Sequence, residues 1–219
     1  MPVSFVEEGQ GAALEAFERE PLPSWRRSGF WTTTVRKLRL DALEPRRYEP
    51  VGSLAELPRV VRDALGPQEL AGIIVQRGAS TVFTELSPEA AEQGVIVTSL
   101  ERAVEEHREL VERWYMKRLS HEEGKFAAAS AAFWTGGAFV HVPPEVRLEQ
   151  PLQVVWLIDE PGTAQYAHTL AVVGEFAECA LREYCLAPPL ERELSSNGSS
   201  GGRRSTPGAS SSTRGRAPR

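Results

Sequence analysis

The stretch from residue 137 to residue 186 constrains the fold most, because its short apolar runs are joined by corners instead of hairpin turns. The runs either alternate in polarity or are apolar throughout, as buried strands do. The corners fall at Pro143-Pro144, Gln150-Pro151, Pro161-Gly162 and Gly174, with no Asn-Gly or Asp-Gly turn between them. Five short strands joined in this way favour a coiled stack of parallel strands, a β-helix, over a meander. A small β-sandwich predicts the same alternation and stays open.

Side-chain alternation assigns an inward and an outward face to these runs. Phe139 and His141 share the face opposite to the small apolar residues of their run, and Arg147 and Glu149 point to solvent. The residues expected to face the core are Ala138, Val140, Val142, Val146, Leu148, Ala177, Cys179 and Leu181. Because only about two turns are present, the last strands would carry unpaired backbone groups, and we expect poor solubility or pairing with another chain. A monodisperse monomer in size-exclusion chromatography would contradict this expectation.

The first half of the chain predicts helices beside a small sheet. Residues 11–20 have helical spacing, and the proline-rich residues 21–25 stop this helix. Residues 53–66 predict a short helix with a proline in its first turn and a glycine at its C-terminal cap. Residues 70–78 are an apolar run that predicts a buried strand, and residues 81–86 predict its partner.

The clearest local signal follows in residues 87–115. Residues 87–94 predict a short helix with serine as its N-cap and proline at its first position. Residues 95–97 predict a strand. Thr98 and Glu101 then form a capping box that begins an amphipathic helix. Its apolar face consists of Leu100, Ala103, Val104, His107, Leu110, Val111, Trp114 and Tyr115.

Residues 195–219 differ sharply in composition from the rest of the chain. They hold eight serines, five glycines and five arginines in 25 residues, without an aromatic or large aliphatic side chain. Such a segment cannot bury enough apolar surface to offset the entropy of ordering, and we expect it to be disordered. Its arginines could contact RNA or acidic partners, although random coding of a GC-rich reading frame would give the same composition.

Charge and motif content exclude several classes of function. The net charge of −5, with −9 carried by residues 1–190, argues against a nucleic-acid binder. No apolar run approaches the ~18 residues of a membrane span, and the N-terminus lacks the pattern of a signal peptide. The sequence contains no P-loop, G-x-S-x-G, H-E-x-x-H or Rossmann glycine motif. Two cysteines form no disulfide framework, so we expect a cytoplasmic protein.

No residue is assigned here to catalysis, to a cofactor or to a metal. Cys179 and Cys185 are too sparse for a zinc or cluster site, which needs a denser group of ligands. Cys179 falls on an inward face and is expected to be structural, whereas Cys185 is more exposed and could be a reactive thiol.

The four histidines are each better explained without a metal. His107 lies on the apolar helix face and is expected to be a core or edge residue with a satisfied hydrogen bond. His141 is expected between strands or at the surface, and His168 at the start of a strand. His121 begins a polar loop of solvated charges with the two glutamates that follow it.

An ordered series of segments resembles the SufB/SufD family of iron–sulfur cluster assembly proteins. The segments are "WTTTVRKLRLDAL", "GVIVTSLERAVEEH", "KFAAASAAFWTGGAFVHVPPEVRLEQPLQVVW" and "AHTLAVVGEFAECALREY". The first is similar to the SufD branch, and the likeness covers roughly residues 20–186. Ala129-Ser130 stand where the family usually has Leu-Asn.

The resemblance implies a helix-rich N-terminal domain followed by a right-handed parallel β-helix. It implies a non-enzymatic SufD-like scaffold that acts beside SufB, with the SufC ATPase as energy-supplying partner, and an iron–sulfur cluster handled by the assembled complex. We expect an α+β fold with an N-terminal domain at 1–122, the start of the β-helix core at 123–188 and a disordered tail at 189–219. Partners would include neither nucleic acid nor a membrane.

The likeness fades near Pro188, where family members continue through more of the β-helix to a helical segment that contacts SufC. We therefore expect a truncation or a change of reading frame, with loss of the SufC contact. Two other readings stay open at this point. One is a non-functional fragment, and the other is a β-helix enzyme of the acyltransferase or lyase type. "VGEFAE" is a single instance of the hexapeptide pattern that such acyltransferases repeat.

Overall fold

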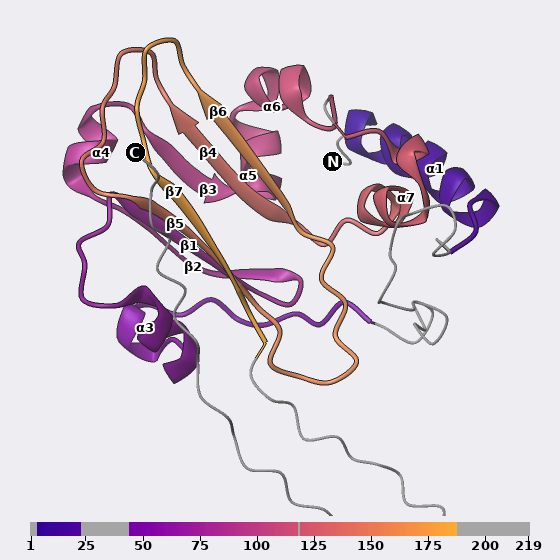
Figure 1. Cartoon of the computed structure of the whole chain (residues 1–219), viewed down its shortest axis with the longest axis horizontal. Coiled ribbons are helices and arrows are strands. Elements are labelled where there is room, and N and C mark those ends of the chain that lie inside the picture. Colours follow the sequence, from indigo (N-terminus) through magenta and orange to yellow (C-terminus); the bar gives the residue numbers. More distant parts are fainter. Residues whose placement is uncertain (1–3, 23–43, 118, 188–219) are drawn as a thin grey trace, which may run out of the picture.

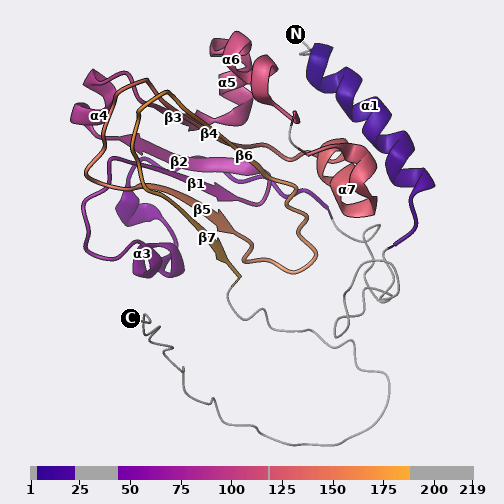
Figure 2. The ribbon, with the colours of Figure 1, turned by 45° about the horizontal axis from the view of Figure 1, so that its top comes forward.

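The computed structural model describes residues 4–22, 44–117 and 119–187. Within these ranges the chain is a mixed α+β fold with two small β-sheets (Figure 1). Helices α1, α5, α6 and α7 gather beside the sheet of β3, β4 and β6, and helix α3 lies beside the sheet of β1, β2, β5 and β7 (Figures 1 and 2). The predicted tail and the first segment of the family likeness fall largely outside the described residues.

The first helix, α1 (Ser4–Arg19), packs against α7 (Lys125–Ala132). It buries a stripe of small apolar side chains, Val6, Ala13 and Ala16. Its Phe17 ring lies edge-on to Phe133, with the ring centroids 4.8 Å apart. The helix predicted for residues 11–20 is thus confirmed, although it begins at Ser4 and ends before the proline-rich segment.

Two short helices follow the capping rules that predicted them. Helix α3 (Arg59–Leu65) ends at Gly66, which adopts a φ of 67°. Its proline occupies the N-cap position, one residue before the predicted first turn. Helix α4 (Pro88–Glu92) is capped by the Ser87 hydroxyl, which accepts a hydrogen bond from the Ala90 amide at 3.2 Å. A one-turn 3₁₀ helix (Leu54–Glu56) precedes α3.

The predicted capping box was wrong by one residue. Strand β3 (Ile96–Ser99) pairs with β4 as far as Ser99, so Thr98 belongs to the sheet. The Ser99 hydroxyl is the N-cap and accepts from the Arg102 amide at 3.2 Å.

The long amphipathic helix was also predicted incorrectly, because the chain breaks it at His107. There the backbone leaves helical geometry (φ −128°, ψ 37°) and separates α5 (Leu100–Glu106) from α6 (Arg108–Trp114). The apolar face is buried at Leu100 and Val111, whereas Trp114 remains 38% exposed. The break lets the chain follow the sheet, with the His107 ring stacked on Phe139 at 6.1 Å between centroids.

The larger sheet has the strand order β2-β1-β5-β7. Strands β1 (Gly72–Arg77) and β2 (Ser80–Leu86) form the predicted antiparallel pair. On its other edge β1 pairs in parallel with β5 (Leu152–Leu157), and β5 pairs in parallel with β7 (Leu181–Leu186).

The smaller sheet has the order β3-β4-β6. Strand β4 (Gly137–Val142) is antiparallel to β3 and parallel to β6 (His168–Val173). From β4 onward the chain therefore alternates between the two sheets, and β6 and β7 each lie beside the strand that comes two strands earlier in the chain. Both sheets contain strands from either side of residue 122.

Two successive corners repeat the same backbone geometry. Glu145 and Phe176 both have positive φ, 66° and 60°, in corresponding corners after β4 and β6. The Glu145 amide donates to the Glu175 carbonyl at 2.9 Å, and the Gly174 amide donates to the Val142 carbonyl at 2.9 Å. The corners thus stack as closely as the strands do.

Apolar side chains of both sheets meet in one core between the sheets. Its buried members include Ile74, Val97, Val140, Val154 and Trp156. The other residues predicted to face the core agree with this, since Ala138 and Val142 are buried in it, and Val146, Leu148, Ala177, Cys179 and Leu181 pack against it.

Four strands, and not the predicted five, form after residue 136 in the described part of the chain. The stretch around Val146 and Leu148 makes only an isolated bridge from Arg147 to Glu178, because it turns a corner there. The last strand also begins later than its alternation suggested, at Leu181.

Candidate functional site

The outer edges of β6 and β7 form the candidate interaction site. Each is the last strand of its sheet among the residues that the structure describes. On β6, the His168 amide donates to the Gly136 carbonyl and the Gly174 amide donates to the Val142 carbonyl. Because successive amides of a strand point to opposite edges, the amides of residues 169, 171 and 173 point away from β4. Ala171 and Val173 are exposed there. An open strand edge of this kind presents ready-made partners for another strand.

A hollow of about 550 Å³ lies between these two last strands. Glu183 of β7 bridges it, since its carboxylate accepts from the Trp156 indole at 3.4 Å and from the Thr169 hydroxyl. The remaining lining residues are Ile158, Gln165, Ala167, Cys185, Leu186 and Ala187. The hollow therefore combines apolar walls with one carboxylate, at the end where the core between the sheets meets solvent.

Cys179 faces the core as alternation predicted, but it precedes β7 and does not lie in a strand. Cys179 is half-buried against the core between the sheets, and burial raises the pKa of its thiol. Cys185 is exposed on β7 and lines the hollow. Both are free thiols.

The histidines are separated by the fold. His141 lies between strands as predicted, with Nδ1 3.2 Å from the Val172 carbonyl oxygen. His168 packs edge-on against Tyr115, with centroids 5.2 Å apart, and burial lowers the pKa of its imidazole. Burial also raises the pKa of Tyr115 to about 12. His121 lies in a one-turn 3₁₀ helix (His121–Glu123). Across the described ranges, no three side chains of the metal-binding types gather into a site.

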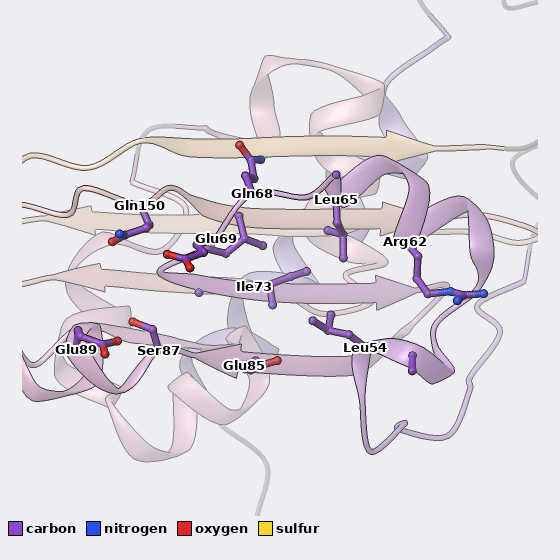
Figure 3. A pocket seen from close by; sticks show the side chains of 14 residues that line it. Leu54, Arg62, Leu65, Gln68, Glu69, Ile73, Glu85, Ser87, Glu89 and Gln150 are labelled. Atoms are coloured by element: carbon purple, nitrogen blue, oxygen red, sulfur yellow. The ribbon is translucent and has the colours of Figure 1, made fainter.

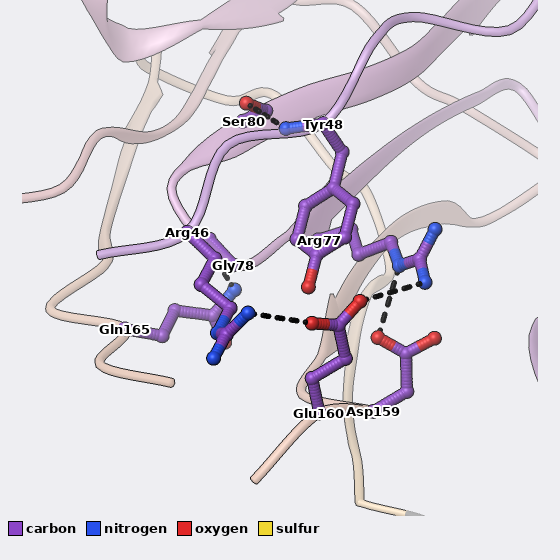
Figure 4. Close-up of polar contacts among 8 residues, drawn as sticks. All are labelled: Arg46, Tyr48, Arg77, Gly78, Ser80, Asp159, Glu160 and Gln165. Atoms are coloured by element: carbon purple, nitrogen blue, oxygen red, sulfur yellow. Dashed lines mark hydrogen bonds and ion pairs between the residues drawn. The ribbon is translucent and has the colours of Figure 1, made fainter. Parts of the chain in front are cut away.

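A cluster of polar side chains joins residues 46–48 to the end of β1 and to the loop after β5 (Figure 4). The Arg77 guanidinium lies 2.9 Å from the Asp159 carboxylate and stacks on the Tyr48 ring at 4.0 Å. Glu160 lies 3.1 Å from Arg46 and 3.8 Å from Arg77. Because each of these charges faces an opposite one, the cluster serves to join three segments and not to bind a ligand.

Sequence reasoning missed Glu101 as a buried group. Its side chain lies under Gly136, where a Cβ would fall 2.1 Å from the Glu101 Oε1 atom. Burial raises the pKa of this carboxyl, and hydrogen bonds from its own amide and that of Gly137 offset part of the effect. The adjacent glycines at 136 and 137 were the sequence signal for this contact, because a side chain can lie directly against the backbone only where that backbone carries no side chain. Glu183 carried no comparable signal, because it sits in an ordinary alternating run.

Comparison with known proteins supports the resemblance that the sequence predicted. The model of the SufBD protein N-terminal region matches residues 78–154. An iron–sulfur cluster assembly SufBD family protein of Staphylococcus haemolyticus (strain JCSC1435) is 29% identical over 188 residues. A SufBD family protein of Staphylococcus aureus (strain USA300) is 28% identical over 188 residues. Each alignment covers 80% of this chain and 39% of the relative, so the chain spans about two fifths of the length of these relatives.

No helix in the described ranges is long and apolar enough to cross a membrane. The region that the family model matches runs from the turn after β1 into β5. It therefore contains β3 and β4, the antiparallel pair of the smaller sheet. The predicted resemblance is therefore confirmed: this chain is similar to iron–sulfur cluster assembly proteins of the SufBD family, and its residues 78–154 match the model of the N-terminal region of that family.

Proposed function

We propose that this chain is a SufD-like, non-catalytic component of the SUF scaffold in the cytoplasm, where it pairs with a SufB homologue beside the SufC ATPase. The observation that carries the proposal is the pair of strand edges at β6 and β7 that have no partner strand among the described residues, on a chain similar to SufBD proteins. A scaffold needs a surface that adds another chain in one register, and parallel edge strands provide such a template.

Strands β4 to β7 support a coil as the underlying architecture. Strands that alternate between sheets and pair in parallel suit the first turns of a right-handed β-helix, and an antiparallel sandwich would pair them differently. The domain boundaries 1–122, 123–188 and 189–219 are proposed from the sequence, although both sheets contain strands from either side of residue 122. The iron–sulfur cluster would be the cargo of the assembled complex. The SufC contact of the family lies in a later segment than the matched one, so SufB is the partner that this region would meet.

The test is co-expression of the chain with the SufB and SufC homologues of the same organism, followed by affinity purification through a tag on this chain. Recovery of SufB is expected, and recovery of neither partner would contradict the scaffold role. A proline in place of Ala171 removes one outward amide of β6 while it leaves the pairing with β4 intact. The matched control is Ala171→Val, which keeps the amide and suits a strand. SufB should be lost with the proline variant and retained with the valine variant.

A further inference from the structure

A second recessed surface lies on the opposite side of the larger sheet, next to α3. This groove has a volume of about 840 Å³ (Figure 3). Its apolar floor is made by Leu54, Leu65 and Ile73. Ile73 and Leu65 are buried, whereas Leu54, on the 3₁₀ helix beside the groove, keeps 36% of its surface exposed. None of the described lining residues comes from β6 or β7, so the groove is separate from the candidate edge site.

The walls of the groove are held by the backbone. The Ala71 amide donates to the Pro151 carbonyl at 3.0 Å, and the Ser87 amide donates to the Ala71 carbonyl at 2.8 Å. Between α3 and β1, Gln68 accepts a hydrogen bond from Arg182 of β7. These contacts tie the loop beside the groove to three strands of the sheet, and such a preformed surface loses little entropy when it binds.

Charged side chains are distributed unequally along the groove. Glu69, Glu85 and Glu89 lie toward one end, and Arg62 lies at the other end (Figure 3). None of these four makes an ion pair with another residue in the described ranges. Most other arginines of the sheet and helices face a carboxylate, for example Arg59 with Asp63 and Arg77 with Asp159. The groove thus has an acidic end with three carboxylates that no cation of the described part of the chain neutralises.

We propose that this groove docks a short peptide segment of a partner protein that carries both lysine or arginine and leucine-sized side chains. The apolar floor selects the leucines, and the three glutamates at one end select the cations. A nucleic acid or another anionic ligand would meet net negative charge here and is disfavoured.

The two kinds of contact contribute differently. Burial of a leucine side chain on the floor supplies most of the affinity, at about 25 cal/mol per Å² of apolar surface. Each exposed carboxylate adds little to the affinity by itself, because surface ion pairs are screened by salt, and the three together contribute measurably only at low salt. They mainly raise the association rate and select the partner. The expected signature is therefore binding that slows as the ionic strength rises while the apolar requirement persists.

The experiment uses the full chain and a fluorescein-labelled peptide of sequence SKLRLKS, with SELELES as the control peptide. Binding is followed by fluorescence anisotropy and stopped flow at low and high salt. The triple variant Glu69→Gln, Glu85→Gln and Glu89→Gln should weaken binding at low salt by about tenfold and should lose most of its salt dependence. The matched control changes three exposed glutamates outside the groove, Glu15, Glu105 and Glu109, to glutamine and should change the affinity by less than about twofold.

A second variant tests the apolar floor. Leu54→Ser should also weaken binding about tenfold, and the exposure of Leu54 means that the fold should tolerate the change. Circular dichroism checks that tolerance. Equal affinity for the two peptides, or a triple variant that binds like the unaltered chain, would overturn the proposal. A chain that dimerises through the groove, so that the peptide dissociates the dimer, would assign the groove to a second copy and would overturn it too. Because neither β6 nor β7 lines the groove, failure here leaves the SufB pairing test unaffected.

Discussion

Replacing Gly137 with alanine tests whether β4 and β6 stack as closely as the structure has them. A Cβ atom at Gly137 would lie 1.9 Å from the His168 carbonyl oxygen, which belongs to the backbone. Ordinary contacts of a Cβ begin at 3.4 Å. The two strands would have to move apart there by about 1.5 Å, because no side chain can rotate out of the way.

That separation disrupts the start of the parallel ladder. The His168 amide, which donates to the Gly136 carbonyl at 3.1 Å, would lose its partner. A buried donor or acceptor left unpaired costs about 1–3 kcal/mol, so the loss of one or two bonds costs about 2–4 kcal/mol. The reduced entropy of the unfolded chain with alanine offsets about 0.4–1 kcal/mol of this. The net expectation is a free energy of unfolding lower by about 2–3 kcal/mol.

Urea denaturation followed by circular dichroism measures the change. Gly9→Ala is the matched control, because Gly9 lies in α1 and a Cβ added there would have no atom within 4 Å. There alanine should raise the stability by about 0.5–1 kcal/mol through its better helix propensity. An unfolding midpoint of Gly137→Ala equal to that of the unaltered chain would refute the close stacking of the two strands.

Four further outcomes are expected. Ser99→Ala should lower the free energy of unfolding by about 1 kcal/mol in urea denaturation, and no loss would remove Ser99 as the cap of α5. Burial raises the pKa of the Glu101 carboxyl above 4.5, so the native state binds its proton more tightly than the unfolded state does, and stability falls as the pH rises from 4.5 through the raised pKa. Glu101→Gln should flatten this fall of Tm with pH in thermal melts. An unchanged slope would contradict the prediction. Burial lowers the pKa of the His168 imidazole below 6.5, so stability is lost as the pH falls below 6.5. His168→Gln should reduce that loss, measured as the difference in Tm between about pH 5.5 and neutral pH. An equal loss in the variant would contradict the prediction. A maleimide should label Cys185 in the native protein well before Cys179, by mass spectrometry, and equal rates would argue against the burial of Cys179.

Local rules predicted the short elements of this fold well. The α4 helix was found because its serine cap, proline and following glycine lie within one stretch of eight residues. The β1–β2 pair was found because an apolar run and its partner are adjacent in the chain. Errors arose where two local signals compete. Thr98 and Ser99 both suit an N-cap, and only the pairing of β3 with β4 decides between them.

Long-range contacts account for most of what sequence could not supply. His107, where the helix breaks, stacks on Phe139, which is 32 positions away, and the partly buried Glu101 lies against the glycine pair at the start of β4. Trp156 and Glu183 meet because β5 and β7 are neighbours in the same sheet. Alternation assigns each of these residues to a face, but it does not say which strand lies beside it.

The pairing of β1 with β5 has a consequence for how the chain folds during synthesis. The β1–β2 hairpin can form as soon as it leaves the ribosome, but the strand that covers the other edge of β1 begins at Leu152, 66 residues after the hairpin ends at Leu86. At ordinary synthesis rates that interval lasts on the order of 3–13 s, far longer than a hairpin needs to form. An apolar strand edge is thus exposed to other nascent chains throughout this time. Slower translation of residues 87–151 would lengthen the exposure, so the yield of folded protein depends on the speed of synthesis as well as on the stability of the final fold.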